Sequence, residues 1–367
     1  MPTLQVILSY LPIKMRKIKV LVVDDSALIR ALLKEIINQS KDMVVIDTAS
    51  DPLIARKKIR DLKPDVITLD IEMPNMNGLE FLEKLMLLHP IPVLMISTLT
   101  EKGSAATLRA LELGAIDFIQ KPKFDVKNKI EEYAEELVAK LRIVAQANVR
   151  PLKSIHSTKP LKIRPTKPVQ NNTHQQAKLL VIGASTGGTE AIKHILVKMP
   201  VNSPPILMVQ HMPEGFTKSF AARINELCQI TVKEAVHNER ILQGHAYLAP
   251  GDYHLTVLKK GVYYYCQLSQ EGTVNFHRPS VDVLFNSVAK FIKNNGVGVI
   301  LTGMGKDGAL GLKNLHDLGC RTFSQDKASC VVFGMPKEAI ELGAVDVIAP
   351  IDELAEHILL HLGYLQA

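Results

Sequence analysis

The segment LLVIGASTGGTEAI, residues 179–192, ends an apolar run in a cluster of small residues and continues as a helix-like pattern. Two chemistries fit such a turn. Its backbone N–H groups could bind a phosphate, as glycine-rich loops in front of helices do. It could also display a nucleophile, because Gly183, Ser185 and Gly187 fit the pattern G-x-S-x-G, in which the serine lies on a sharp strand-to-helix turn.

The next apolar segment favours the nucleophile. In a dinucleotide-binding fold the second strand ends in an acidic residue that binds a ribose hydroxyl. Here the segment 206–210 ends in Gln210 and is followed by His211, and the glycines of the turn miss the G-x-G-x-x-G spacing. An imidazole at the neighbouring strand end is instead placed to accept the proton of Ser185.

A third residue is needed to orient that imidazole. The strand-like segment 297–301 leads into a glycine-rich loop that contains Asp307. Because the carboxyl ends of parallel strands share one edge of a sheet, we expect Asp307 beside Ser185 and His211. The three strand ends would then supply a nucleophile, a base and an orienting carboxylate.

Supporting groups are expected around this triad. Backbone N–H groups near Met304, with the N-terminus of the helix after Ser185, could form an oxyanion hole. The hydroxyl of Thr186 could make a local hydrogen bond or help to hold His211. Other histidines stay open as the base: His194, His237, His245, His254 and His277.

The segment HRPSVDVLF, residues 277–285, allows two interpretations. His277 and Arg278 could line a substrate groove, and Asp282 could act as a second carboxylate. The apolar residues around Asp282 instead favour the start of a core helix, and this is the interpretation that we prefer.

A second set of polar residues lies in the first half of the chain. Residues 18–123 alternate apolar strands with amphipathic helical patterns, which predicts a (βα)5 doubly wound parallel sheet. The polar residues at the predicted strand ends are Asp24, Asp25, Asp70, Ser97 and Lys121. Three carboxylates at one edge repel one another, and Mg²⁺ would offset their charge while leaving positions open for phosphate oxygens. A hydroxyl and an ammonium group complete a site for a phosphoryl group on one carboxylate.

The motifs VVDDS, LDIEMPNMNG, IST and IQKP resemble those of response-regulator receiver domains, over residues 18–140. The resemblance implies that Asp70 accepts phosphate from a histidine kinase. It also implies a set of Mg²⁺ ligands: Asp25, Asp70 and the backbone carbonyl of Glu72, with Asp24 acting through water. The residues that it places against the phosphoryl group are Ser97 and Lys121.

The motifs IGASTGGTEA, VQHMP, YLAPGDYHL, HRPSVDVLF and LTGMGKDGA resemble the catalytic domain of chemotaxis protein-glutamate methylesterases, the CheB family, over residues 178–365. The resemblance implies Ser185 as nucleophile, His211 as base and Asp307 as its orienting residue. The implied substrates are glutamate γ-methyl esters on the cytoplasmic helices of chemoreceptors, and many members also deamidate glutamines there. The chain order Ser, His, Asp differs from that of α/β-hydrolases, so we expect a doubly wound, mostly parallel α/β domain of another fold.

Composition and charge fit this organisation. Apolar residues make up 47% and charged residues 22% of the 367 positions. From Arg150 to Lys178 the chain has basic residues, prolines and no acidic residue, which accounts for the net charge of +7 and indicates a linker rather than a nucleic-acid-binding arm. The expected segments are an extension (1–17), a receiver domain (18–140), a linker (141–177) and a catalytic domain (178–367).

The sequence as a whole predicts a phosphorylation-controlled carboxylic ester hydrolase, whose receiver inhibits it until Asp70 is phosphorylated. We expect Mg²⁺ in the receiver, no cofactor for ester hydrolysis, no nucleic-acid partner and no insertion into a membrane. Four cysteines without C-x-x-C spacing favour the cytoplasm. The alternatives are a receiver-controlled binding module without catalysis and a transcriptional regulator, although the second half shows no helix with a basic face.

Overall fold

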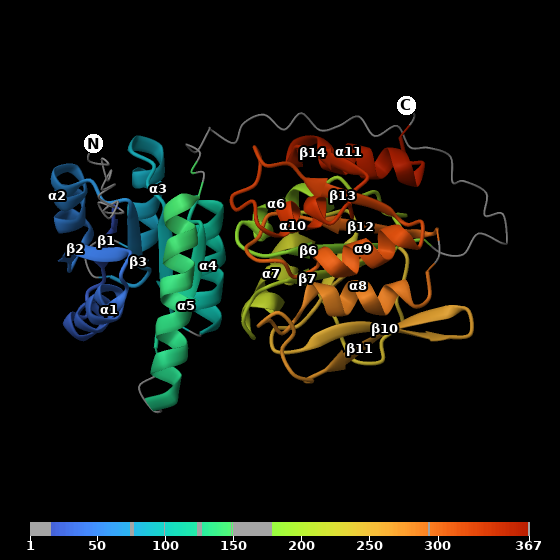
Figure 1. The fold of residues 1–367 in the computed structure, drawn as a ribbon, viewed down its shortest axis with the longest axis horizontal. Helices are drawn as coiled ribbons and strands as arrows, with labels where there is room; N and C mark the ends of the chain where they lie inside the picture. The colour runs from blue at the N-terminus through green and yellow to red at the C-terminus, as the bar shows by residue number, and fades with distance from the viewer. Residues whose placement is uncertain are drawn as a thin grey trace, which may run out of the picture.

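The computed structural model describes residues 16–73, 77–98, 100–122, 127–147, 149, 178–292 and 294–365. They form two α/β units, each built on its own sheet (Figure 1). The predicted extension up to residue 15 and the predicted linker from residue 150 to 177 lie outside the described residues.

The first unit has a five-stranded parallel sheet in the order β2-β1-β3-β4-β5. Its elements are β1 (Ile18–Val23), α1 (Ala27–Gln39), β2 (Met43–Ala49), α2 (Pro52–Leu62), β3 (Val66–Asp70), α3 (Gly78–Leu88), β4 (Val93–Ser97), α4 (Glu101–Glu112), β5 (Asp117–Gln120) and α5 (Lys127–Gln146). This is the predicted (βα)5 arrangement. Helix α5 continues six residues beyond the boundary expected at residue 140.

Local sequence explains where these elements begin. The buried run Val20–Val23 makes β1 a central strand, because both faces of a parallel sheet are covered by helices. Ser26 and Asp51 accept backbone N–H groups at the first turns of α1 and α2 and so cap them.

The second unit has a seven-stranded sheet in the order β14-β13-β12-β6-β7-β9-β8, in which all neighbours are parallel. Its elements are β6 (Leu179–Ala184), α6 (Gly188–Leu196), β7 (Ile206–Gln210), α7 (Phe216–Asn225), β8 (Thr231–Glu234), β9 (His245–Leu248), β10 (His254–Lys260), β11 (Tyr263–Ser269), α8 (Val281–Ala289), β12 (Gly296–Ile300), α9 (Ala309–Asp317), β13 (Arg321–Gln325), α10 (Met335–Glu341), β14 (Val347–Ala349) and α11 (Ile351–Leu362). The antiparallel pair β10-β11 lies outside this sheet. The predicted doubly wound, mostly parallel fold is therefore confirmed.

Helices cover both faces of this sheet. The buried side chains of α8, α9 and α10 belong to one core cluster, and those of α6, α7 and α11 belong to another. Strand β6 lies between β7 and β12, so the loops after these three strands emerge side by side at one edge. This central position is where doubly wound sheets bind their ligands.

The two units pack against each other through the α4, β5 and α5 side of the first unit (Figure 1). The ring centroids of Phe118 and Phe216 lie 4.5 Å apart across this contact. Arg223 of α7 forms an ion pair with Glu112 of α4. The receiver-like unit therefore lies directly beside the elements that follow β6 and β7.

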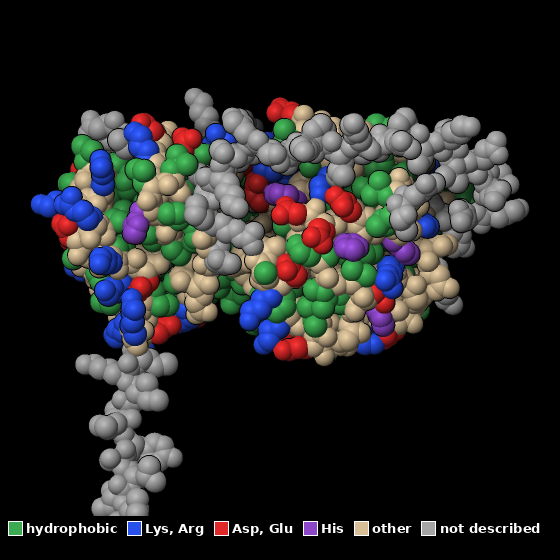
Figure 2. Space-filling model, turned by 90° about the horizontal axis from the view of Figure 1, so that it is seen from above, with side chains coloured by type: hydrophobic (Ala, Val, Ile, Leu, Met, Phe, Trp, Pro, Cys, Tyr) green, Lys and Arg blue, Asp and Glu red, His purple; other side chains and the backbone are tan. Residues whose placement is uncertain are grey.

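On the face shown in Figure 2, Lys and Arg side chains lie among Asp and Glu side chains in both units.

Within the described part of the chain, no helix is long and apolar enough to cross a membrane.

Helix α8 approaches β6 very closely because Gly183 has no side chain. A methyl group added at Gly183 would lie 2.2 Å from Cγ1 of Val281, the first residue of α8. Gly308, with a φ of 87°, lets the loop after β12 pass over the same valine. The sequence therefore uses glycine to bring three segments together at the carboxyl edge of the sheet.

We predict that Gly183→Ala destabilises the second unit by about 1–3 kcal/mol, because the new methyl group overlaps Val281 and α8 must shift. Thermal or denaturant unfolding measures this change. Gly272→Ala is the matched control, since its methyl group would meet no atom within 4 Å and should leave the midpoint nearly unchanged. Equal stability of the two variants would contradict the close packing of α8 on β6.

Candidate functional site

Ser185 lies immediately after β6, in the turn that leads into α6, and it is partly exposed. Its backbone N–H donates to the carbonyl of Thr302 (3.0 Å), and its own carbonyl accepts from Gly188 N (2.7 Å) and Gln210 Nε2 (2.9 Å). Gly187 has a φ of 77°, which favours glycine. Among the described residues, no hydrogen bond occupies the Ser185 hydroxyl. The turn is thus fixed through its backbone while the hydroxyl stays available.

The backbone of His211 lies beside that of Ser185, because the residues that precede them, Gln210 and Ala184, are paired at the ends of β7 and β6. Its Nε2 lies 2.8 Å from Oδ2 of Asp307, and its side chain is only 7% exposed. Its Nδ1 is buried and has no hydrogen-bond partner within the described part of the chain. When Nε2 carries the proton shared with Asp307, Nδ1 is the nitrogen that is free to accept another proton.

The Asp307 carboxylate lies at the N-terminus of α8 and is 1% exposed. Besides His211, its donors are Asn275 Nδ2, Ser280 Oγ and the backbone N–H groups of Val281 and Asp282, at 2.6–3.2 Å. Burial alone would raise the pKa of Asp307, but the hydrogen bonds and charge of His211, with those from Asn275 and Ser280, outweigh it and hold the pKa well below its usual range. Asp307 therefore stays ionised and can balance a positive imidazole.

The segment 277–285 opens a core helix, as preferred from the sequence, and it also contributes to the site. Ser280 caps α8 and donates to Asp307. Asp282 accepts from Asn275 and from the backbone of Gly311, and burial raises its pKa. Asp282 thus links Asn275 to the first turn of α9 and does not contact the imidazole.

His277 packs against the imidazole of His211. The two rings are stacked, with centroids 3.7 Å apart and planes inclined by 16°. Burial, followed by the nearby His211, lowers the pKa of His277 to about 3, so His277 is neutral in ordinary buffers. A neutral flat ring at this position limits how far His211 can rotate.

The remaining candidate histidines are bound elsewhere. His254 is buried and bridges the carbonyl of Gly272 and the backbone N–H of Ser280. The other three each contact a backbone group outside the site; they are His194, His237 and His245. His211 is therefore the candidate base that contacts Asp307.

The loop after β12 lies against the serine. A methyl group added at Gly303 would be 2.7 Å from Cβ of Ser185, so the peptide between Gly303 and Met304 is close to the nucleophile. Met304 is 44% exposed, and its backbone N–H stays the predicted oxyanion donor.

Thr186 points to the other unit rather than to His211. Its hydroxyl donates to Oδ2 of Asp117, the first residue of β5, at 2.7 Å. Lys140 of α5 is paired with the same carboxylate oxygen at 3.1 Å. The residue after the nucleophile is thus tied to the first unit, a contact for which the sequence carried no signal.

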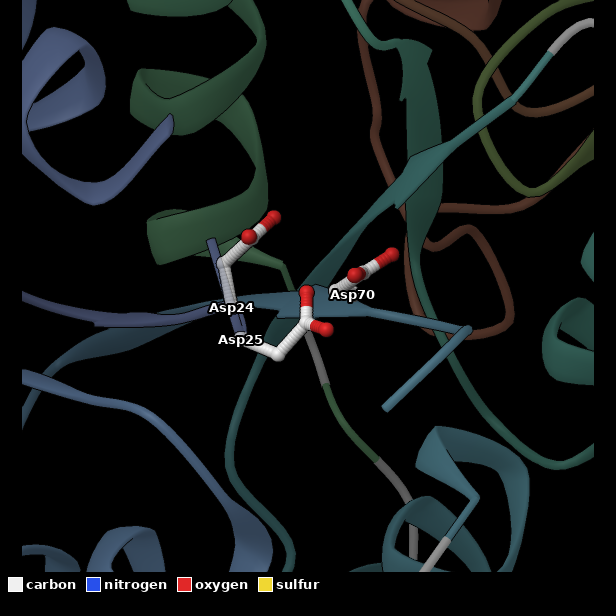
Figure 3. A group of neighbouring side chains, drawn as sticks. All are labelled: Asp24, Asp25 and Asp70. Atoms are coloured by element: carbon white, nitrogen blue, oxygen red, sulfur yellow. The ribbon is translucent and has the colours of Figure 1, made fainter. Parts of the chain in front are cut away.

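The acidic cluster of the first unit is formed as expected. Asp24, Asp25 and Asp70 have carboxylate oxygens within 4.8 Å of one another at the ends of β1 and β3 (Figure 3). Nζ of Lys121 lies 2.7 Å from Asp70 and 3.4 Å from Asp24. Burial, opposed in part by the hydrogen bond from Lys121, raises the pKa of Asp70 to about 6, and the charge of Asp24 adds to this. Asp24 Oδ2 is buried, and among the described residues its one ion-pair partner is Nζ of Lys121 at 3.4 Å, so the cluster keeps more negative than positive charge, as a cation site requires.

Of the other residues predicted around this cluster, Ser97 faces away from Asp70, whereas Glu72, the predicted carbonyl ligand of Mg²⁺, lies next to it. Ser97 ends β4, but its hydroxyl forms a hydrogen bond with Thr107 Oγ1 at 2.5 Å. The backbone N–H of Glu72 donates to Asp70 Oδ1 at 3.3 Å, so Glu72 follows the acceptor carboxylate closely. Ser97 would have to rotate away from Thr107 to reach a phosphoryl group.

Known protein families match both units of the chain. A family model described as CheB methylesterase matches residues 180–358, and one described as response regulator receiver domain matches residues 20–132. A protein-glutamate methylesterase/protein-glutamine glutaminase of Nitrosomonas europaea is 56% identical, covering 95% of this chain and 97% of its own, and one of Geobacter metallireducens is 57% identical, covering 92% and 94%. The solved CheB methylesterase catalytic domain of Thermotoga maritima is 41% identical, covers 50% of this chain and 98% of its own, and has a TM-score of 0.49. The chain therefore belongs to the family of CheB methylesterases that carry a response regulator receiver domain.

Proposed function

We propose that the chain is a protein-glutamate methylesterase that hydrolyses glutamate γ-methyl esters on chemoreceptors, under the control of its receiver unit. The observation that carries the proposal is the buried Asp307–His211 pair at the sheet edge that also bears Ser185. Relatives named both methylesterase and glutaminase support hydrolysis of glutamine side chains by the same residues. The cytoplasm is the proposed compartment, which four free thiols fit.

The mechanism is acyl transfer in two steps. Ser185 Oγ attacks the ester carbonyl carbon while Nδ1 of His211 takes its proton, and ionised Asp307 stabilises the resulting imidazolium. The Met304 backbone N–H would stabilise the oxyanion. His211 then returns the proton to the leaving methoxide, and methanol departs. Water attacks the serine ester by the same route, which restores Ser185 and leaves a glutamate carboxylate.

A receiver-controlled binding module without catalysis is the alternative function. The environment of Asp307 argues against it. Burying an ionised carboxylate is costly, and five donors, from His211 and from the 275–282 segment, keep this one charged beside an imidazole with a free nitrogen.

We predict that Ser185→Ala lowers methanol release from methylated receptor by about 10⁴-fold, because the nucleophile is lost. His211→Ala should be about as damaging, and the double variant little worse, since the two residues act as a unit. Gas-chromatographic measurement of methanol tests both. Retention of a large share of the activity by Ser185→Ala would refute the nucleophile assignment. If the wild-type protein itself releases no methanol from methylated receptor, the proposed function is refuted.

The receiver site is proposed to bind Mg²⁺ and to accept phosphate on Asp70 from a chemotaxis histidine kinase. Asp24, Asp25 and Asp70, with the Glu72 carbonyl, fit a hard divalent cation, because three carboxylates face one ammonium group. The cation neutralises charge at the carboxylate that is phosphorylated. Lys121 is close enough to contact the phosphoryl group that forms there.

We predict that Mg²⁺ raises the unfolding temperature of the wild-type receiver unit and that Asp25→Asn largely abolishes this shift. Saturation at about a hundred times the dissociation constant corresponds to about 2.7 kcal/mol. Asp61→Asn, in an exposed pair with Arg60, is the control and should keep the full shift. An unchanged shift in Asp25→Asn would remove that residue from the metal site.

The receiver is proposed to inhibit by covering the Ser185 turn. The hydrogen bond from Thr186 to Asp117 ties the two units together one residue from the nucleophile, and Lys140 holds the Asp117 carboxylate from within the first unit. The Arg223–Glu112 pair and the Phe118–Phe216 contact lie in the same interface. Phosphorylation at Asp70 would bias the receiver toward a state in which this interface opens.

We predict that Asp117→Ala raises the basal, unphosphorylated esterase rate about tenfold or more, because the charge-assisted contact with Thr186 is worth about 1.5–3 kcal/mol. The gain from a small phosphodonor should shrink accordingly. Rates on methylated receptor, with Asp61→Asn as control, measure both effects. A basal rate equal to or below that of the wild type would contradict inhibition through this contact.

A further inference from the structure

The loop beside the catalytic pair is a tight hairpin turn over Val274–His277. Val274 N donates to His277 O (3.1 Å), and His277 N donates to Val274 O (2.9 Å). The two central residues, Asn275 and Phe276, have φ values of 52° and 67°. Two positive φ values in a two-residue turn are typical of type I′, which favours Asn at the first position and Gly at the second. Asn275 fits this rule, but Phe276 does not.

The turn is fixed to the catalytic pair from both sides. Asn275 Nδ2 donates to Asp307 (2.9 Å) and to Asp282 (2.8 Å). His277 stacks on His211. Arg278, the next residue, donates to Asp252 (3.0 Å) and so anchors the segment farther from the site. Phe276 therefore has a defined position relative to the ester-cleaving groups.

Phe276 contributes nothing to packing, since the residue is 97% exposed. A positive φ is a strained conformation for a bulky side chain, and an exposed ring gains no hydrophobic stabilisation. Folding alone would favour glycine or asparagine here. Strained backbone conformations cluster at functional sites, so the strain at Phe276 indicates a functional contact.

Two more exposed apolar side chains follow residues that touch the site. Met304 is next to Gly303, which lies against Ser185, and Leu310 follows Asp307 by three residues and is 56% exposed. The receiver unit does not cover Phe276, because the residue is 97% exposed when both units are present. What remains is a molecule that approaches Ser185 from solvent.

We infer that Phe276 is a substrate-binding residue that contacts an apolar side chain of the protein substrate, on the same face of its helix as the esterified glutamate. Side chains three or four residues apart on a helix lie about 5–6 Å from each other, so a second contact next to the ester is within reach of a neighbouring ring. This inference rests on the proposed function. It gives the enzyme a means to prefer an ester carried by a polypeptide helix over a small free ester.

The test compares Phe276→Gly with the wild type as full-length chains, both activated by the same phosphodonor. Two substrates are used: methylated receptor cytoplasmic domain and a small N-acylated glutamate γ-methyl ester. Loss of a half-buried ring contact should lower kcat/KM on the receptor about tenfold, mainly through KM. The small ester, which cannot reach the ring, should change less than about twofold.

Three further measurements make the result specific. Because glycine suits a φ of 67°, Phe276→Gly should unfold at the same or a higher temperature than the wild type, which excludes misfolding. Phe276→Tyr keeps the ring and should keep receptor activity. Val262→Gly, at the 79% exposed tip between β10 and β11, should affect neither substrate.

An unchanged kcat/KM on receptor in Phe276→Gly would overturn the inference. An equal loss on both substrates would overturn it as well, because the turn would then act by positioning His211 and Asp307. Failure of the wild type to hydrolyse either ester would instead count against the proposed function, so the two failures are distinguishable.

Discussion

The second unit depends on one buried charge, the carboxylate of Asp307 at the N-terminus of α8. An ion in this position is tolerable only when donors surround it, and here they come from the 275–282 segment and from His211. Those donors can converge only if α8 lies directly on β6, which Gly183 and Gly308 permit. The orientation of the imidazole therefore follows from the packing of a helix on a strand.

Each unit uses the carboxyl edge of its own sheet, and the two edges have opposite electrostatic roles. Asp307 has donors on all sides and a lowered pKa, so its charge is constant and it can orient a base. Asp70 faces Asp24 across one ammonium group and has a pKa raised to about 6, so its charge calls for a cation. The units meet where Thr186 donates to Asp117, which places the control surface one residue from the nucleophile.

The two folds and the approximate positions of the site residues could be predicted from the sequence, because the carboxyl ends of parallel strands converge at one edge whatever the lengths of the loops. The alternating patterns and polar strand ends indicated both sheets and the neighbourhood of Ser185, His211 and Asp307. The residues that hold Asp307 could not be found in this way, since Asn275 and Ser280 are brought to it by helix packing. The partner of Thr186 was missed for a similar reason: Asp117 belongs to another unit, 69 positions away in the chain. Ser97 lies at the predicted strand end, but whether its hydroxyl faces Asp70 or Thr107 depends on α4.

The proposed catalytic arrangement depends on which nitrogen of His211 is free. Nitrogen NMR of chain labelled with ¹⁵N-histidine reports the protonation of each imidazole nitrogen, and the signals of His211 are those that vanish in His211→Gln. The structure predicts a proton on Nε2, shared with Asp307, and an unprotonated Nδ1, with the Nε2 signal shifted in Asp307→Asn. A proton on Nδ1 and a bare Nε2, unaffected by Asp307→Asn, would contradict the proposed catalytic arrangement.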